Sequence, residues 1–255
     1  MLQFYEELRR SRNCGLTGRK VVERRIFPKI ATLGVLSLFL SSCDLFAPLT
    51  DESYRFRMIV EVETPDGLRA GSSVYEVTAG NRTALLPDMA DRHKNLRGEA
   101  VTVDLPGGRM LFALLETPNW QRDDLTEMSM DALDPAYNND WVQSAERISD
   151  SGRGISPAEV EPENYPYLVT FRNLNDPQSV ERINPANLAE RFGDGVRLNR
   201  IWVELTEDAV TTEIDRKLNW LSTHQGTLVP SDGLHPQNPE MDFTSKAFIR
   251  GKEYE

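Results

Sequence analysis

Apolar side chains from Tyr54 to Val62 occupy the even positions of residues 54–64, and polar side chains occupy the odd positions except at Ile59. A period of two is typical of a strand that is buried on one face. Residues 65–67, Pro-Asp-Gly, predict a turn, because proline fixes φ and glycine accepts a positive φ. A second strand, reaching Val77, should complete an antiparallel hairpin.

The same design recurs in residues 98–116. Val101, Val103 and Leu105 alternate with polar residues, and residues 106–108, Pro-Gly-Gly, predict another turn. Residues 110–115 are apolar at every position, which favours a strand that is buried on both faces. The N-terminal half of the domain is therefore expected to consist of antiparallel hairpins.

Residues 118–166 depart from these patterns, because they are rich in Asp, Asn, Ser, Gly and Pro and contain few periodic segments. Long irregular stretches inside a domain are typical of functional loops. We expect an irregular excursion here, with one short helix near residues 141–148.

The strand expected at 196–205 changes its apolar phase between Leu198 and Ile201, which predicts a β-bulge near Asn199 and Arg200. The predicted fold class is α+β and β-rich, with a few short helices in the C-terminal half of a single domain, residues 53–255. The other elements expected after residue 166 are strands at 167–172 and 246–250 and helices at 184–192 and 212–223.

The N-terminal segment carries a different pattern. Residues 30–40 form an uncharged apolar run of 11 residues, and Arg24, Arg25 and Lys29 precede it. A membrane-spanning helix needs about 20 apolar residues. The shorter run and its basic flank favour the apolar core of a signal peptide.

Leu40, Ser41, Ser42 and Cys43 follow the order of the lipobox of bacterial lipoproteins, an aliphatic residue and two small residues before a cysteine. The segment resembles that family. The resemblance implies cleavage before Cys43, a diacylglyceryl group on its thiol and often a further acyl chain, such as palmitate, on the new amine. Residues 1–42 would then be removed, and residues 43–52 would form a lipidated tether. An ordinary signal peptide that is cut elsewhere, or a buried helix that ends in cysteine, is the alternative.

Arg24 and Arg25 also resemble the paired arginines of the twin-arginine export signal. Glu23 and Pro28 depart from that pattern, so an ordinary basic flank is the alternative. Asp44 resembles the inner-membrane retention signal of enterobacterial lipoproteins. Together these features predict a protein on the periplasmic side of a membrane, with the inner membrane indicated by Asp44.

Charge and cysteine content limit the partners. The 213 residues from Cys43 onward carry 21 basic and 37 acidic side chains, a formal net charge of −16. Such a domain repels nucleic acid, so no nucleic-acid partner is expected. Cys14 and Cys43 are the only two cysteines of the chain, so we expect no disulfide in the exported domain.

The densest polar cluster lies within residues 118–166. Carboxylate and amide oxygens suit Ca²⁺, and Asp131, Asp134 and Asp140 are the candidate ligands. Their spacing does not match an EF-hand loop, and a solvated acidic loop is the alternative. Trp120 and Trp141 flank the cluster and are either exposed binding anchors or residues that pack the excursion down.

The chain contains no zinc-protease, nucleophile-elbow, P-loop or dinucleotide-binding motif. Residues 171–177 and 219–221 resemble pieces of an uncharacterised family of bacterial lipoproteins, which implies no known activity. The expected function is a lipid-anchored, non-catalytic binding or assembly module for an unknown envelope protein. The alternative is a carboxylate-dependent hydrolase, with Ca²⁺ as a candidate cofactor, that uses residues 118–166.

Overall fold

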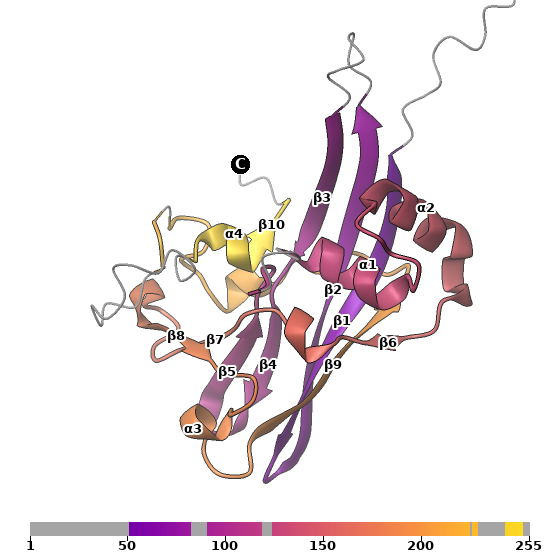
Figure 1. Cartoon of the computed structure of the whole chain (residues 1–255). Helices are drawn as coiled ribbons and strands as arrows, with labels where there is room; N and C mark the ends of the chain where they lie inside the picture. The colour runs from indigo at the N-terminus through magenta and orange to yellow at the C-terminus, as the bar shows by residue number, and fades with distance from the viewer. Residues whose placement is uncertain (1–50, 83–90, 119–123, 225, 229–242, 252–255) are drawn as a thin grey trace, which may run out of the picture. The chain divides into compact units, whose positions relative to one another are not determined.

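A computed structural model describes residues 51–82, 91–118, 124–224, 226–228 and 243–251, all of which belong to one compact unit, Ala47–Glu255. These residues form two antiparallel sheets (Figure 1). The larger sheet has the strand order β10-β3-β2-β1-β9-β6, and the smaller sheet has the order β4-β5-β7-β8. The α+β, β-rich fold class with short helices mostly in the C-terminal half is confirmed.

The strands are β1 (Glu52–Thr64), β2 (Gly67–Arg82), β3 (Asp91–Glu99), β4 (Val101–Leu105), β5 (Arg109–Ala113), β6 (Ala158–Glu159), β7 (Leu168–Phe171), β8 (Val180–Ile183), β9 (Arg197–Leu205) and β10 (Ile249–Arg250). The α-helices are α1 (Leu125–Leu133), α2 (Trp141–Ser151), α3 (Ala189–Phe192) and α4 (Ser245–Phe248). Short 3₁₀ turns lie at η2 (Pro106–Gly108), η3 (Gly152–Gly154), η4 (Pro162–Asn164), η5 (Pro177–Ser179) and η6 (Ile214–Arg216).

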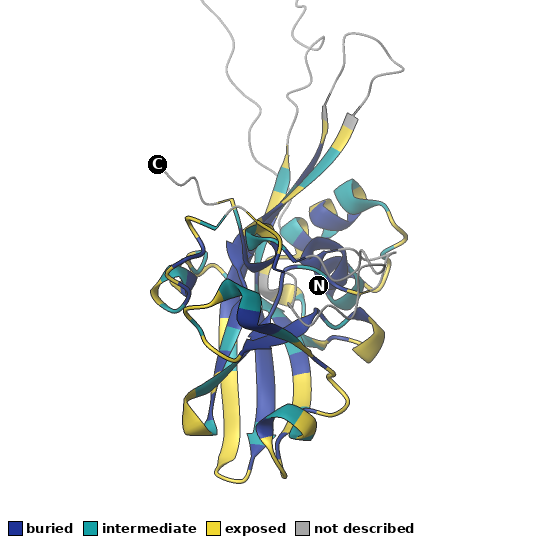
Figure 2. Ribbon diagram, turned by 90° about the vertical axis from the view of Figure 1, so that its left-hand side faces the viewer, coloured by how far each residue is buried: buried dark blue, intermediate teal, exposed yellow. Residues whose placement is uncertain are grey.

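The hairpin of β1 and β2 is the centre of the larger sheet. The alternation predicted for β1 is confirmed, because Phe56, Met58, Val60 and Val62 are all fully buried on one face. Gly67 ends the turn with a φ of 108°, a backbone conformation that is unfavourable for residues with a Cβ. Figure 2 shows the buried residues along the middle of the sheets and the exposed ones at strand ends and loops.

The buried face of β1 is covered by two different layers. Near the start of the strand, α1 and α2 lie over it, and the Tyr54 hydroxyl is hydrogen-bonded to Ser129 Oγ of α1 at 2.8 Å. Near the other end, the smaller sheet crosses at Gly71, where an added Cβ would lie 2.0 Å from the carbonyl oxygen of Thr102. A glycine is therefore needed where β4 passes over β2.

The bulge predicted in the strand at 196–205 is confirmed. The register between β1 and β9 shifts between Glu61 and Val62, so that Arg200 is opposite Glu61 and Leu198 is opposite Val62. Asn199 is the extra residue of β9, at the position where the apolar phase of the sequence changes.

The expectation of a single helix within residues 118–166 is wrong. The predicted helix is α2, but α1 precedes it, and Asp124 caps α1 by accepting a hydrogen bond from Thr126 N at 2.9 Å. Residues on nearly all sides of α1 are buried, including its polar residues Thr126, Glu127 and Ser129. A helix whose polar residues are buried together with its apolar residues lacks the polar, solvent-facing stripe by which a surface helix is recognised in a sequence.

The prediction of a helix at 212–223 is also wrong, because only η6 and a series of turns form there. Its apolar residues Ile214, Leu218 and Leu221 are nevertheless buried. Two further predicted elements differ in the structure from the bounds or type expected. The helix expected at 184–192 shortens to α3, and the strand expected at 246–250 is α4 followed by β10.

Candidate functional site

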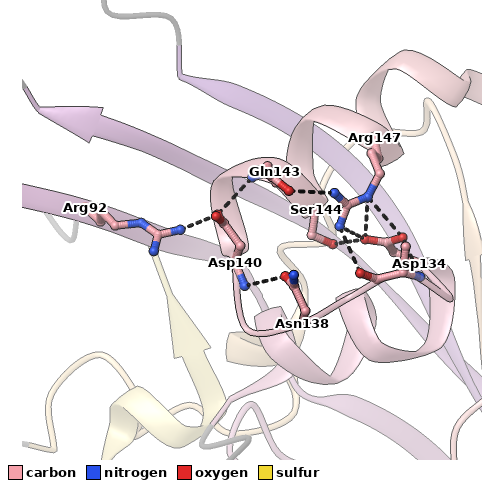
Figure 3. A network of polar contacts seen from close by, with 8 residues as sticks. Arg92, Asp134, Asn138, Asp140, Gln143, Ser144 and Arg147 are labelled. Atoms are coloured by element: carbon pink, nitrogen blue, oxygen red, sulfur yellow. Dashed lines mark hydrogen bonds and ion pairs between the residues drawn. The ribbon is translucent and has the colours of Figure 1, made fainter.

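The acidic segment folds into a polar network between α1 and α2 (Figure 3). Asp134, at the end of α1, accepts hydrogen bonds from Ser144 Oγ and from Arg147 Nη2, both at 2.7 Å. Burial by itself raises the pKa of Asp134, but the hydrogen bonds from Arg147 and Ser144 outweigh it and lower the pKa. Asp134 is therefore a charged residue that ties the two helices together.

Asp140 performs a similar structural task at the start of α2. Its carboxylate accepts a hydrogen bond from Gln143 N at 3.2 Å and forms an ion pair with Arg92 of β3. A carboxylate at a helix N-terminus stabilises the helix. Figure 3 shows Asp140 and Asp134 at opposite sides of the α2 turn, each directed toward its own arginine.

Asp131, the third candidate calcium ligand, accepts a hydrogen bond from Asn164 Nδ2 at 2.8 Å. It lines a hollow of about 140 Å³ together with Glu159 and Glu161. Within the described residues, no group of three or more His, Cys, Asp or Glu side chains is arranged to hold a metal ion. The calcium prediction stays a prediction.

Trp141 is half-buried against the core, and two cations of β3 lie over its ring. Arg92 is 5.2 Å and Lys94 is 5.3 Å from the ring centroid. These contacts hold α2 against the polar strand β3, which sequence inspection missed because residues 91–95 contain no apolar side chain. Trp120 lies outside the described residues.

A second polar cluster fixes the bulge on the outer face of the larger sheet. Glu61 accepts hydrogen bonds from Asn199 Nδ2 and Arg200 Nε, both at 2.9 Å, and from Trp202 Nε1 at 3.1 Å. The hydrogen bond from Arg200 is the main reason that the pKa of Glu61 falls to about 2. The bulge directs Asn199 toward this carboxylate.

We predict that Glu61 makes stability depend on pH. Because its pKa in the folded state lies below the ordinary value of 4.5, its contribution is complete above that pH and is lost as the pH falls toward 2. Glu61→Gln should lower the free energy of unfolding by about 2 kcal/mol at pH 7. The difference from wild type should shrink between pH 4.5 and pH 3 in urea titrations.

The matched control for this prediction is Glu190→Gln, since Glu190 is exposed and accepts one hydrogen bond, from Asn187 Nδ2. Its free energy of unfolding should stay near that of wild type at every pH. A Glu61→Gln deficit of equal size at pH 7 and pH 3 would contradict the role assigned to Glu61.

A groove of about 290 Å³ lies beside the start of β1. Its floor contains Tyr54, Ile148 and Leu205, and its rim contains Arg55 and Glu207. The groove is assembled from β1, the end of α2 and the end of β9, which are far apart in the sequence. No sequence pattern indicated it.

Comparison with protein-family models, with curated proteins and with solved structures finds no match to this chain. Among the described residues, no helix has the length and apolarity that a membrane crossing requires.

Proposed function

We propose that the protein is a lipid-anchored, non-catalytic binding module of the bacterial envelope, held on the periplasmic side of a membrane by acyl chains on Cys43. The observation that carries the proposal is the sequence Leu40-Ser41-Ser42-Cys43 directly after the uncharged apolar run of residues 30–40. One acyl chain binds a membrane only marginally, whereas two or three anchor it stably, because each buried CH₂ contributes about 0.8 kcal/mol. Asp44 favours the inner membrane.

The distance between this anchor and the folded domain supports a binding role close to the bilayer. The first strand begins at Glu52, nine residues after Cys43. Nine extended residues span at most about 30 Å. Ser53, the second residue of β1, lines the groove. A ligand in the groove would therefore be bound within reach of the membrane surface.

The hydrolase alternative is supported less well by the described residues, although Asp131, Glu159 and Glu161 line one hollow. Its central carboxylates, Asp134 and Asp140, are each engaged by an arginine and by a second donor. An acid and base pair would need two carboxylates whose environments separate their pKa values while leaving them accessible to a substrate.

Mass spectrometry of the protein purified from native membranes tests the anchor directly. We expect an N-terminal peptide that starts at Cys43 and carries the mass of a diacylglyceryl group, with or without an additional acyl chain. An unmodified Cys43 thiol, or a mature N-terminus elsewhere, would refute the proposal.

A further inference from the structure

The groove beside β1 exposes an edge of the larger sheet. On one side, β1 pairs with β2 along its whole length, from Glu52 to Thr64. On the other side, its pairing with β9 starts only at Phe56, opposite Leu205. In the part of the chain that the structure describes, no strand runs along this second side of residues 52–54.

The direction of the main chain at this edge follows from the neighbouring hydrogen bond. Thr206 N donates to the carbonyl oxygen of Arg55 at 3.0 Å, so the peptide groups of Arg55 point toward β9. In an antiparallel ladder, residues two apart point their N–H and C=O groups to the same side. The N–H and C=O groups of Ser53 therefore point to the side of β1 where the groove lies, and an extended backbone placed there can pair with both.

The rest of the groove suits the side chains of such a segment. Its floor is apolar, since Ile148 is 1% exposed and Tyr54 is 6% exposed, and Leu205 is half-buried beside them. Side chains of an added strand alternate between two faces. One face would contact this floor, and the other would face the solvent near Arg55 and Thr206.

Charge indicates the composition of the segment. The lining contains two acidic residues, Glu76 and Glu207, and one basic residue, Arg55, whose guanidinium is paired with Glu76 at 3.1 Å and donates to the backbone carbonyl oxygen of Glu207 at 3.3 Å. The domain as a whole carries a net charge of −16 from Cys43 onward. Complementary charge accelerates and orients association, so a basic segment is favoured over an acidic one.

We propose that the groove binds an extended, basic segment of a partner protein, which adds to the larger sheet as a strand beside Ser53 and continues the line of β9. This inference rests on the proposed function, because it names the class of partner that the tethered module would bind.

The test uses the full-length mature protein in lipid nanodiscs and a fluorescein-labelled peptide of alternating valine and lysine, about seven residues long. We expect saturable binding by fluorescence anisotropy, and no binding of a peptide that alternates valine and glutamate. Ser53→Pro should weaken binding about ten-fold or more, because it removes the N–H donor and its ring blocks the approaching strand.

Ser53→Ala is the matched control, since it keeps the N–H group and should bind like wild type. Proline is tolerated where the N–H does not take part in the ladder, so the pairing of β1 with β2 should survive in Ser53→Pro, as thermal unfolding would verify. Ser149→Arg, at the rim of the groove, is a second variant that should weaken binding by occupying the space and repelling lysine.

Equal binding by wild type, Ser53→Pro and Ser149→Arg would overturn the inference, as would failure of wild type to bind the basic peptide. A wild-type dimer that Ser53→Pro converts to a monomer in sedimentation would also overturn it, because the occupant would then be a second copy of the chain. These results leave the anchor untouched, since the mass of the modified Cys43 peptide is measured in the same sample.

Discussion

Replacement of Cys43 by alanine is expected to move the protein from the membrane fraction to the soluble fraction almost completely. The substitution removes the thiol on which the proposed acyl chains depend, and with it a binding free energy of about 0.8 kcal/mol for each buried CH₂ group. The remaining domain carries a charge of −16, which disfavours contact with an anionic lipid surface. Fractionation of cells that express the variant measures the change.

Cys14→Ala is the matched control for this experiment, because Cys14 is the other cysteine of the chain and lies within the segment that we expect to be removed. It should leave the membrane association intact. A Cys43→Ala variant that remained in the membrane fraction would show that another feature attaches the protein. An uncleaved precursor is recognised by its larger mass on a gel.

The second large effect is expected at Gly71, where the two sheets cross. A Cβ there would approach the carbonyl oxygen of Thr102 to 2.0 Å, and a backbone atom has little freedom to retreat. Gly71→Ala should therefore force β4 away from β2 and lower the free energy of unfolding by about 3 kcal/mol or more. In a domain of this size, the melting temperature should fall by about 10 °C.

Gly154→Ala provides the comparison, since a Cβ added at Gly154 would meet no described atom within 4 Å and the residue is exposed. Its free energy of unfolding should change by less than about 0.5 kcal/mol. Calorimetry of the two variants separates the steric effect from the general cost of replacing glycine. Equal melting temperatures would mean that the sheets can separate at this crossing without loss.

The elements that were predicted well have an apolar face toward the core and a mostly polar outer face. The alternation of β1 could be detected because its even positions face the core and most of its odd positions carry polar side chains on the outer face of the sheet. The bulge at Asn199 could be predicted from the same alternation, because an extra residue reverses its phase. A period of two therefore specified both the strand and its irregularity.

The elements that were missed lack such a contrast. α1 is buried on nearly every side, and its polar residues Thr126, Glu127 and Ser129 are buried with the apolar ones, so no polar stripe marks a solvent-facing side. β3 begins with polar residues, because Arg92 and Lys94 face Trp141 and the carboxylates of the helical layer rather than an apolar core. Turns replaced the helix expected at 212–223, although Ile214, Leu218 and Leu221 are buried as that pattern required.

The sequence by itself determined the candidate anchor at Cys43, the negative charge of the domain, the β-rich class and the bulge in β9. These features depend on neighbouring residues or on composition. Only the tertiary structure decided that Asp134 and Asp140 each bind an arginine and that β1, α2 and β9 enclose a groove. The physical reason is that each arrangement depends on how separate elements pack: Arg92 and Asp140 are 48 residues apart, and Asp134 and Arg147, although 13 residues apart, meet only because α1 and α2 pack together. Local periodicity does not specify which elements meet.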